Sequence, residues 1–167
     1  MTGSPAPGST RACGRSCRAA RQTVDLIAGV VGSPVTVDRD LQERSYGEAE
    51  GRPHAWLCER SRPLPGVGER LHHDEGLAGA ETRWQLAQRA HRSMERLLSS
   101  DAQHQIVVTH SGTVTFLIAA WIGVPLVSAG RADFPVRAGS ITWLRRDPDS
   151  HTHQVCRLDD LNHLDPA

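Results

Sequence analysis

A strand that leads directly into an apolar helix constrains the fold of this chain more than any other feature. It lies in HQIVVTHSGTVTFLIAAWIGVP, residues 104–125. The β-branched run at 105–109 is typical of a buried strand, and residues 112–123 are typical of a buried helix. His110 lies between them, at the carboxyl end of the strand. Because open α/β sheets bind ligands at the carboxyl ends of their strands, the sequence predicts a functional site near His110.

Helices and strands alternate along the rest of the chain. An amphipathic helix over 16–31 starts at the candidate cap Ser16. Its expected buried stripe consists of Ala20, Thr23, Leu26, Ile27 and Val30. A second amphipathic helix is predicted over 81–99, and short strands are predicted at 34–38, 140–147 and 153–160. This alternation indicates an α/β sandwich.

The chain has 167 residues, enough for one domain with a full core. Residues 1–14 are rich in glycine, proline and serine and are expected to be disordered, so the folded domain is expected to span 15–167. Within it, residues 52–80 contain several prolines and glycines, which prevent a long helix. A loop of this length inside a compact domain is typical of a lid or a binding segment.

Composition argues against several function classes. The formal net charge is zero, which gives no support for a nucleic-acid partner. The longest apolar run, Val114–Val127, is too short to cross a membrane. The first residues carry arginines without an apolar segment, so they do not form a secretory signal, although an arginine-rich, acid-free start also fits a transit peptide. Four irregularly spaced cysteines indicate free thiols and a cytoplasmic location.

Four segments carry motifs in a recognisable order. SCRAARQTVDLIA (16–28) is similar to a helix of the form S-x-L-x-R-A-x-Q-T-A-x-x-I, and LQERSYGEAEG (41–51) is similar to a loop L-x-E-x-x-x-G-x-x-E-G. GAETRWQLAQR (79–89) resembles the helix start G-E-S-x-x-x-x-x-x-R, and IVVTHSGTV (106–114) resembles the strand and loop V-V-x-H-G-G-x-I. Together they resemble the histidine phosphatase superfamily, whose fold is called phosphoglycerate mutase-like.

The resemblance implies a three-layer α/β/α sandwich with a mostly parallel sheet, and a phosphomonoester hydrolase acting on a small phosphorylated metabolite. In such enzymes one histidine attacks phosphorus, arginines and a second histidine hold the phosphoryl oxygens, and a carboxylic acid protonates the leaving oxygen. By this resemblance His110 is the second histidine and Glu43 is the general acid, while the backbone of Ser111 adds to the phosphate site. The resemblance implies no metal ion and no organic cofactor.

Two departures from the family pattern bear on activity. The family's nucleophile lies in an R-H-G segment at the end of the first, central strand, and this chain contains no R-H-G. The residues before Ser16 are too polar for that strand, so the usual first strand is expected to be missing. The family's phosphate-binding arginine aligns with Ala19, which leaves the neighbouring Arg18 and Arg21 as candidate phosphate-binding residues.

Two functional readings therefore stay open. The chain is either a phosphatase whose sequence is truncated by a misplaced start codon or a frameshift, or a catalytically dead relative that binds a phosphate ligand or serves in regulation. A C-x5-R loop, as in cysteine phosphatases, does not replace the nucleophile, because Ala19 and Thr23 stand where Cys13 and Cys17 would require arginine. Without a central strand, its neighbours would expose unpaired backbone groups, so a homo-oligomer joined through a strand edge is expected.

Overall fold

The computed structural model describes residues 8–13 and 18–164. Its helices and strands are β1 Ser9–Cys13, α1 Arg18–Val31, β2 Val35–Asp38, α2 His54–Arg60, α3 Arg83–Leu98, β3 Gln105–Val108, α4 Ser111–Trp121, β4 Ile141–Arg146 and β5 His153–Asp160. Each helix and strand predicted from sequence periodicity is confirmed, with bounds that differ by one or two residues. The predicted cap Ser16 lies outside the described residues.

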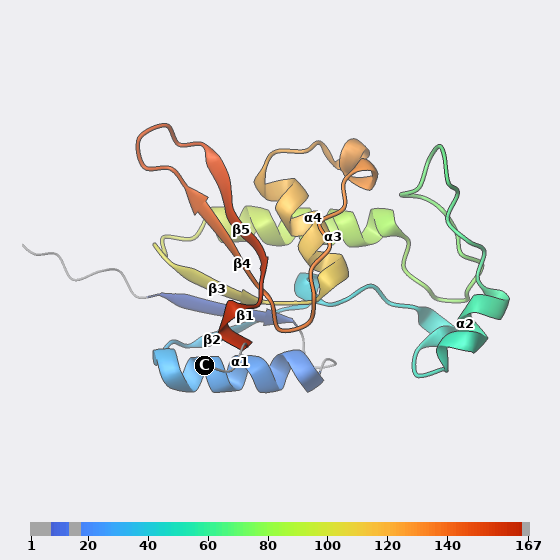
Figure 1. Cartoon of the computed structure of the whole chain (residues 1–167), viewed down its shortest axis with the longest axis horizontal. Coiled ribbons are helices and arrows are strands. Elements are labelled where there is room, and N and C mark those ends of the chain that lie inside the picture. The colour runs from blue at the N-terminus through green and yellow to red at the C-terminus, as the bar shows by residue number, and fades with distance from the viewer. Residues whose placement is uncertain (1–7, 14–17, 165–167) are drawn as a thin grey trace, which may run out of the picture.

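Three layers make up the domain. Strands β2, β1 and β3 form a parallel sheet in that order, with α1 on one face and α3 and α4 on the other (Figure 1). Strands β4 and β5 form a separate antiparallel pair. This pair is fastened to the end of α4, because the Trp121 ring stacks on His153 at 4.1 Å and its Nε1 donates to the Gln154 carbonyl at 3.1 Å. The predicted three-layer α/β/α architecture is confirmed.

The first strand, which was expected to be missing, is present, and that prediction was wrong. Residues 9–13 form β1 at the centre of the sheet, although they lie in the segment expected to be disordered. Thr10 of β1 pairs in parallel register with Val35 of β2 and with Ile106 of β3. The prediction looked for long apolar side chains, whereas this strand buries the small side chains of Thr10 and Ala12. Backbone hydrogen bonds join β1 to β2 on one side and to β3 on the other. Both neighbouring strands therefore pair with a strand of the same chain.

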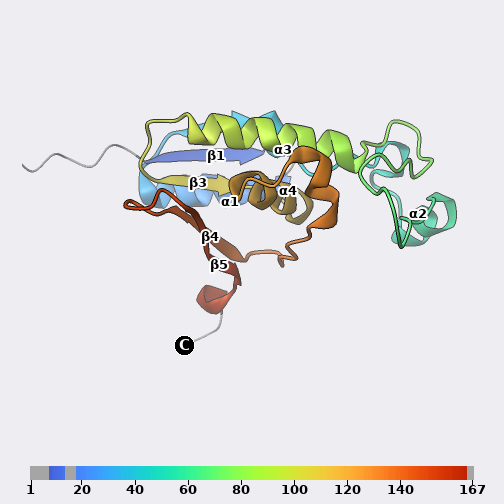
Figure 2. The ribbon, with the colours of Figure 1, turned by 90° about the horizontal axis from the view of Figure 1, so that it is seen from above.

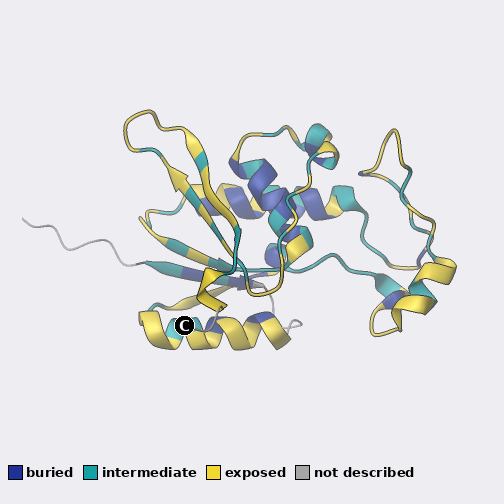
Figure 3. Ribbon diagram, in the orientation of Figure 1, coloured by how far each residue is buried: buried dark blue, intermediate teal, exposed yellow. Residues whose placement is uncertain are grey.

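The hydrophobic core lies between α3 and α4 (Figure 3). Helix α4 is apolar around most of its circumference, as expected for a buried helix, and its residues Phe116 to Ala119 are all buried. Helix α3 contributes one buried stripe, made of Leu86, Ala87, Ala90, Met94 and Leu97. No helix within the described ranges is long and apolar enough to span a membrane.

Helix α1 buries a narrower face than the one predicted. Ala20 is buried, as predicted, but Leu26 and Val30 of the same expected stripe are 74% and 91% exposed. Val24, which lies outside the expected stripe, is the second buried residue and stands one helical turn after Ala20. Figure 3 shows the result, because most of α1 is coloured as exposed.

Residues 52–80, predicted as a lid, extend beyond the amino-terminal end of α3 and include the short helix α2 (Figure 2). The carboxyl-terminal end of the segment is held near the body of the domain. At its far end Ala80 forms a bridge with Tyr46, and the Ala78 carbonyl accepts a hydrogen bond from the Glu48 amide at 2.9 Å. Within the segment, Leu71 returns to the core and is 3% exposed.

Candidate phosphate site at the carboxyl edge of the sheet

His110 and the start of α4 form one side of the candidate site. His110 is the N-cap of α4 in an extended conformation, and its carbonyl accepts the first helical hydrogen bond from the Val114 amide at 2.9 Å. The amides at the start of a helix have no partner within the helix and carry its partial positive charge. His110 Nε2 is buried and has no hydrogen-bond partner in the described part of the chain. The carboxyl end of β3 therefore presents unused hydrogen-bonding groups, as an anion site requires.

The carboxylate of Glu43 sits against the same helix start. Its Oε2 accepts a hydrogen bond from the Gly112 amide at 3.2 Å, and its Oε1 accepts one from the Arg44 amide at 2.9 Å. A Cβ atom on Gly112 would lie 2.5 Å from Glu43 Oε1. Glycine at this position is what lets the carboxylate approach the helix.

Two threonines beside His110 hold the loop that carries Glu43. Thr109 Oγ1 donates to the Leu41 carbonyl at 2.6 Å, and Thr113 Oγ1 donates to the Gln42 carbonyl at 2.7 Å. Both bonds join the β3–α4 connection to the backbone immediately before Glu43. The two candidate catalytic residues, far apart in sequence, are thereby fixed to each other.

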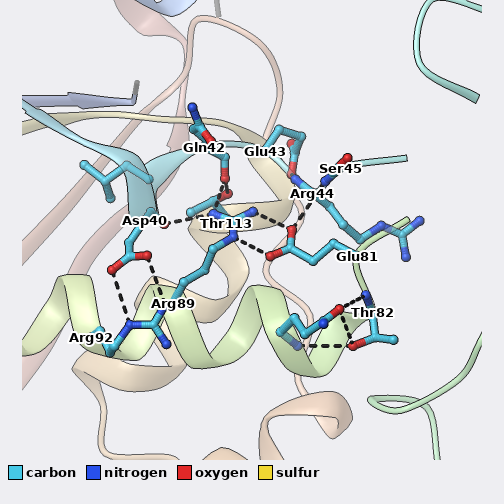
Figure 4. A network of polar contacts seen from close by, with 12 residues as sticks. Asp40, Gln42, Glu43, Arg44, Ser45, Glu81, Thr82, Arg89, Arg92 and Thr113 are labelled. Carbon is cyan, nitrogen blue, oxygen red and sulfur yellow. Dashed lines mark hydrogen bonds and ion pairs between the residues drawn. The ribbon is translucent and has the colours of Figure 1, made fainter. Parts of the chain in front are cut away.

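Arg89 of α3 fastens the same loop from the other side (Figure 4). It donates to the carbonyl of Asp40 at 2.9 Å and to that of Gln42, while its other nitrogens donate to both carboxylate oxygens of Glu81 at 2.7 and 2.8 Å. The Arg89 and Glu81 side chains are only 10% and 17% exposed. The Arg89–Glu81 pair is thus a largely buried clamp on the loop that carries Glu43. This contact accounts for the acidic residue and the arginine in the 79–89 motif.

A cavity of about 500 Å³ opens beside this arrangement. Its polar lining includes Glu43, Arg44, Glu75, Arg83, Ser111 and Asp133, and its apolar lining includes Tyr46, Phe116 and Phe134. The volume is that of a small-molecule site. The cavity runs from the start of α4 to the amino-terminal end of α3, and the 52–80 segment adds Leu64 and Glu75 to its lining.

Arg44 is already neutralised in this cavity. It donates to both carboxylate oxygens of Glu75, at 2.7 and 3.0 Å, and its guanidinium lies 4.5 Å from the centre of the Tyr46 ring. Burial by itself lowers the pKa of Arg44, but the hydrogen bonds and charge of Glu75 outweigh burial and raise it. Since Glu75 lies in the 52–80 segment, this pair also ties that segment to the loop beside Glu43.

The structure brings together three of the five predicted site residues. Glu43 and Ser111 line the cavity at the start of α4, and His110 directly precedes Ser111 as the helix N-cap but is not one of the lining residues. Arg18 and Arg21, predicted to bind phosphate, lie on α1 across the sheet from α3 and α4, and both are exposed (Figure 1). Arg21 forms a 3.7 Å ion pair with Asp25, and neither arginine lines the cavity.

The prediction did not single out Arg44, Arg83, Thr115 or Asp133, which line the cavity. Thr115 and Asp133 are linked by a hydrogen bond of 3.0 Å, which fixes the wall behind α4. Arg83 gives a weak signal in the sequence, since it follows the helix cap Thr82 directly. No group of three histidine, cysteine, aspartate or glutamate residues suited to a metal ion occurs within 8–13 and 18–164.

The end of the central strand is the remaining part of the site. β1 ends at Cys13, whose backbone pairs with Asp38 at the end of β2, while Ala12 pairs with Val108 at the end of β3. At 12–14 the sequence reads Ala-Cys-Gly, and no R-H-G occurs in the sequence. The central strand itself is present as β1.

The family model described as the histidine phosphatase superfamily (branch 1) matches residues 16–158. The chain belongs to this superfamily. Among curated histidine phosphatase relatives, a putative phosphoserine phosphatase 2 of Hydrogenobacter thermophilus is 29% identical over 112 residues, which are 65% of this chain and 54% of the relative. The chain thus spans about half the length of that relative.

Solved histidine phosphatase structures share the fold. The alpha-ribazole phosphatase of Shigella flexneri superposes with a TM-score of 0.70 at 22% identity, over 91% of this chain and 73% of that one. A mycobacterial glucosyl-3-phosphoglycerate phosphatase, solved with inorganic phosphate, gives a TM-score of 0.67 at 20% identity, over 92% and 77%. At such identities the likeness establishes the fold of the domain, and these relatives bear phosphatase names.

Proposed function

We propose that this chain is a phosphomonoester hydrolase of the histidine phosphatase type that acts on a small phosphorylated metabolite. One observation carries the proposal: the Glu43 carboxylate lies at the start of α4, where it accepts a hydrogen bond from the Gly112 amide. Gly112 follows His110, the N-cap of this helix, by two residues. In phosphomonoester hydrolysis, the departing alcohol needs a proton donor, and the phosphoryl group needs an anion-binding site such as a helix start.

Each residue has a defined part in this proposal. Protonated His110 and the amides at the start of α4 hold phosphoryl oxygens, which positions phosphorus for attack and stabilises charge that develops on it. Glu43, when protonated, gives its proton to the ester oxygen as the P–O bond breaks. Water supplies the attacking oxygen, which bonds to phosphorus as the P–O bond to the ester oxygen breaks, so the products are inorganic phosphate and the alcohol.

The substrate class rests on the cavity and on the relatives together. The relatives carry names for three different phosphorylated small molecules or their glycosides, so a phosphomonoester is their common chemistry. The lid at 52–80 and the cavity at its base would select among such molecules. Cys58 and Cys156 are exposed free thiols, which favours a cytoplasmic setting for this activity.

A second candidate is a binding protein without turnover, and one observation favours it. The residues at the end of β1 are Ala12 and Cys13 instead of arginine and histidine, while the groups that would hold a phosphate next to β3 are retained. Such a chain binds a phosphorylated ligand but forms no phosphohistidine.

An aryl phosphate assay separates the hydrolase from the binding protein. It compares turnover by the unaltered chain with turnover by the variants Glu43→Gln and Glu95→Gln. Glu95 is exposed on α3 and serves as the control. For the hydrolase we expect turnover that falls by about 10²- to 10⁴-fold in Glu43→Gln alone. Absence of turnover together with His110-dependent binding of inorganic phosphate supports the binding protein. Absence of both turnover and phosphate binding contradicts both proposals.

A further inference from the structure

Helix α2 carries a histidine and a cysteine whose side chains are in contact. His54 and Cys58 are four residues apart, so they lie on the same face of the helix, one turn from each other. The Cys58 Sγ atom lies 3.4 Å from His54 Nδ1 and 3.7 Å from His54 Nε2. In the part of the chain that the structure describes, the two side chains form no other hydrogen bond and no ion pair. The contact joins a nucleophile to a base.

An imidazole beside a thiol makes the sulfur a better nucleophile. The thiolate, and not the thiol, attacks an electrophile, so the thiol must first lose its proton. In the tautomer that carries its proton on Nε2, His54 Nδ1 faces the Cys58 sulfur as a proton acceptor. The imidazolium that forms then lies against the thiolate and stabilises its negative charge.

Small molecules in solution have access to this pair. Both residues are exposed, and α2 lies at the end of the domain remote from the β4–β5 pair (Figures 1 and 2). Neither residue belongs to the lining of the cavity beside Glu43. A reagent therefore reaches Cys58 without entering the proposed phosphate site, and the function proposed above makes no use of the pair.

Cys156 provides a comparison within the same chain. It is also an exposed free thiol, but its sulfur contacts the amide oxygen of Gln154, at 3.9 Å. An amide oxygen accepts hydrogen bonds but is not a base that takes up the thiol proton. If exposure alone decided reactivity, Cys58 and Cys156 would react alike.

We propose that Cys58 and His54 form a modification site at which a small disulfide attaches to the protein as a mixed disulfide. His54 Nδ1 accepts the proton of the Cys58 thiol, and the Cys58 sulfur attacks one sulfur of the disulfide. The S–S bond of the disulfide breaks as the new S–S bond to Cys58 forms, and the released thiolate takes up a proton. The disulfide is the oxidant, and a second thiol reverses the exchange.

The neutral reagent bis(2-hydroxyethyl) disulfide tests this site without bias from the charges around α2. The purified full chain is treated at about pH 7.5, where an ordinary imidazole is mostly neutral. After quenching and digestion, mass spectrometry of the peptides measures the mixed disulfide on each cysteine separately. The variant His54→Gln removes the base. His104→Gln is the matched control, because His104 is an exposed histidine that directly precedes β3.

We expect Cys58 to react about 10-fold faster than Cys156, or more, in the unaltered chain and in His104→Gln. In His54→Gln the rate at Cys58 should fall to about that of Cys156. The rate at Cys156 should be the same in all three proteins, which reports that the domain folds normally in each variant. Dithiothreitol should remove the adduct from Cys58.

Two results would overturn the inference. Equal rates at Cys58 and Cys156 in the unaltered chain would show that the imidazole does not activate the thiol. A fast reaction at Cys58 that persists in His54→Gln would attribute the rate to exposure and remove His54 from the site. Both results are read from the modification itself, so they do not depend on whether the chain hydrolyses a phosphomonoester.

Discussion

The backbone amide of Gly112 donates a hydrogen bond to the side chain of Glu43 at 3.2 Å, although 69 residues separate the two in the sequence. This bond joins the loop after β2 to the start of α4. It places a carboxyl group beside the helix end where an anion would bind. The geometry leaves no room for a side chain at 112, because a Cβ atom there would lie 2.5 Å from Glu43 Oε1.

Gly112→Ala is therefore expected to displace the Glu43 carboxyl group with little effect on the fold. The clash is with the end of a flexible side chain, so the free energy of unfolding should change by less than about 1 kcal/mol. Turnover should fall by about 10-fold or more, since the proton donor is moved. Gly29→Ala is the control, because a Cβ at Gly29 meets no atom within 4 Å. Urea unfolding and an aryl phosphate assay measure the two effects. Full activity in Gly112→Ala would remove Glu43 from the chemistry.

Replacing Arg89 by leucine should destabilise the domain strongly. Arg89 donates to the carbonyls of Asp40 and Gln42 and pairs with the nearly buried Glu81, which would be left without its partner. Breaking a buried pair in this way costs about 3 to 5 kcal/mol. Arg92→Gln removes an arginine from the same helix that is 55% exposed, and should cost less than about 1 kcal/mol. Equal unfolding midpoints in urea for the two variants would contradict the role of Arg89 as a clamp.

The stability contributed by Asp40 should depend on pH. Burial by itself raises the pKa of Asp40, but its hydrogen bonds and ion pairs with Arg92 and Arg96 outweigh burial and lower the pKa below its usual value. A carboxyl group with a lowered pKa stabilises the fold above the unfolded value of about 3.9, and this stabilisation disappears as the pH falls through the folded value.

Asp40→Asn is thus expected to lower the free energy of unfolding by about 1 kcal/mol at about pH 7, and to have almost no effect near pH 2. Urea denaturation at both pH values gives the comparison. Asp149→Asn is the control, since the Asp149 side chain is exposed and forms no ion pair with any residue in the described ranges. If Asp40→Asn lowers the free energy of unfolding equally at both pH values, the contribution of Asp40 comes from its packing and not from its charge.

Inorganic phosphate should stabilise the folded chain through His110. A ligand that binds only the folded state at about 100 times its dissociation constant adds about 2.7 kcal/mol, which a thermal melt detects as a higher Tm. We expect His110→Ala to abolish this shift and His104→Ala to retain it, because His104 is an exposed residue at the opposite end of β3. A phosphate-dependent Tm that survives in His110→Ala would place the anion elsewhere.

The outer edges of the sheet predict self-association. β2 and β3 each pair with β1 on one side only, and Val37 of β2 is 50% exposed. An exposed strand edge with apolar side chains favours pairing with a second copy. We expect Val37→Lys to shift the chain toward monomer in analytical ultracentrifugation, whereas Val67→Lys, at a 92% exposed position in the lid, should not. A monomer across all accessible concentrations of the unaltered chain would refute the prediction.

Sequence patterns predicted the elements whose apolar periodicity is strong, and failed where small or polar residues carry the structure. The run at 105–109 and the helix after it are apolar enough to be recognised alone. β1 is not, because Thr10 and Ala12 become a strand only by pairing with β2 and β3. Similarly, the buried face of α1 depends on the sheet beneath it, and Val24 is buried while Leu26 is exposed.

In the candidate site, too, sequence motifs identified some residues, and others became apparent only from the fold. His110 and Glu43 were predicted because motifs mark them. Arg83 carries no motif, and only the fold shows that it lines the cavity. The motif around Arg89 could be noticed in the sequence, but its purpose is visible only when its hydrogen bonds to the Asp40 and Gln42 carbonyls are known.

The central position of β1 also has a consequence for how the chain is made. β1 leaves the ribosome before its two partners, which are β2, beginning at Val35, and β3, beginning at Gln105. The nascent chain must carry a half-paired strand until the lid and α3 have been synthesised. Long-range parallel pairing of this kind slows folding and exposes strand edges meanwhile. The sheet can therefore be completed only after β3 has been synthesised, about 90 residues after β1.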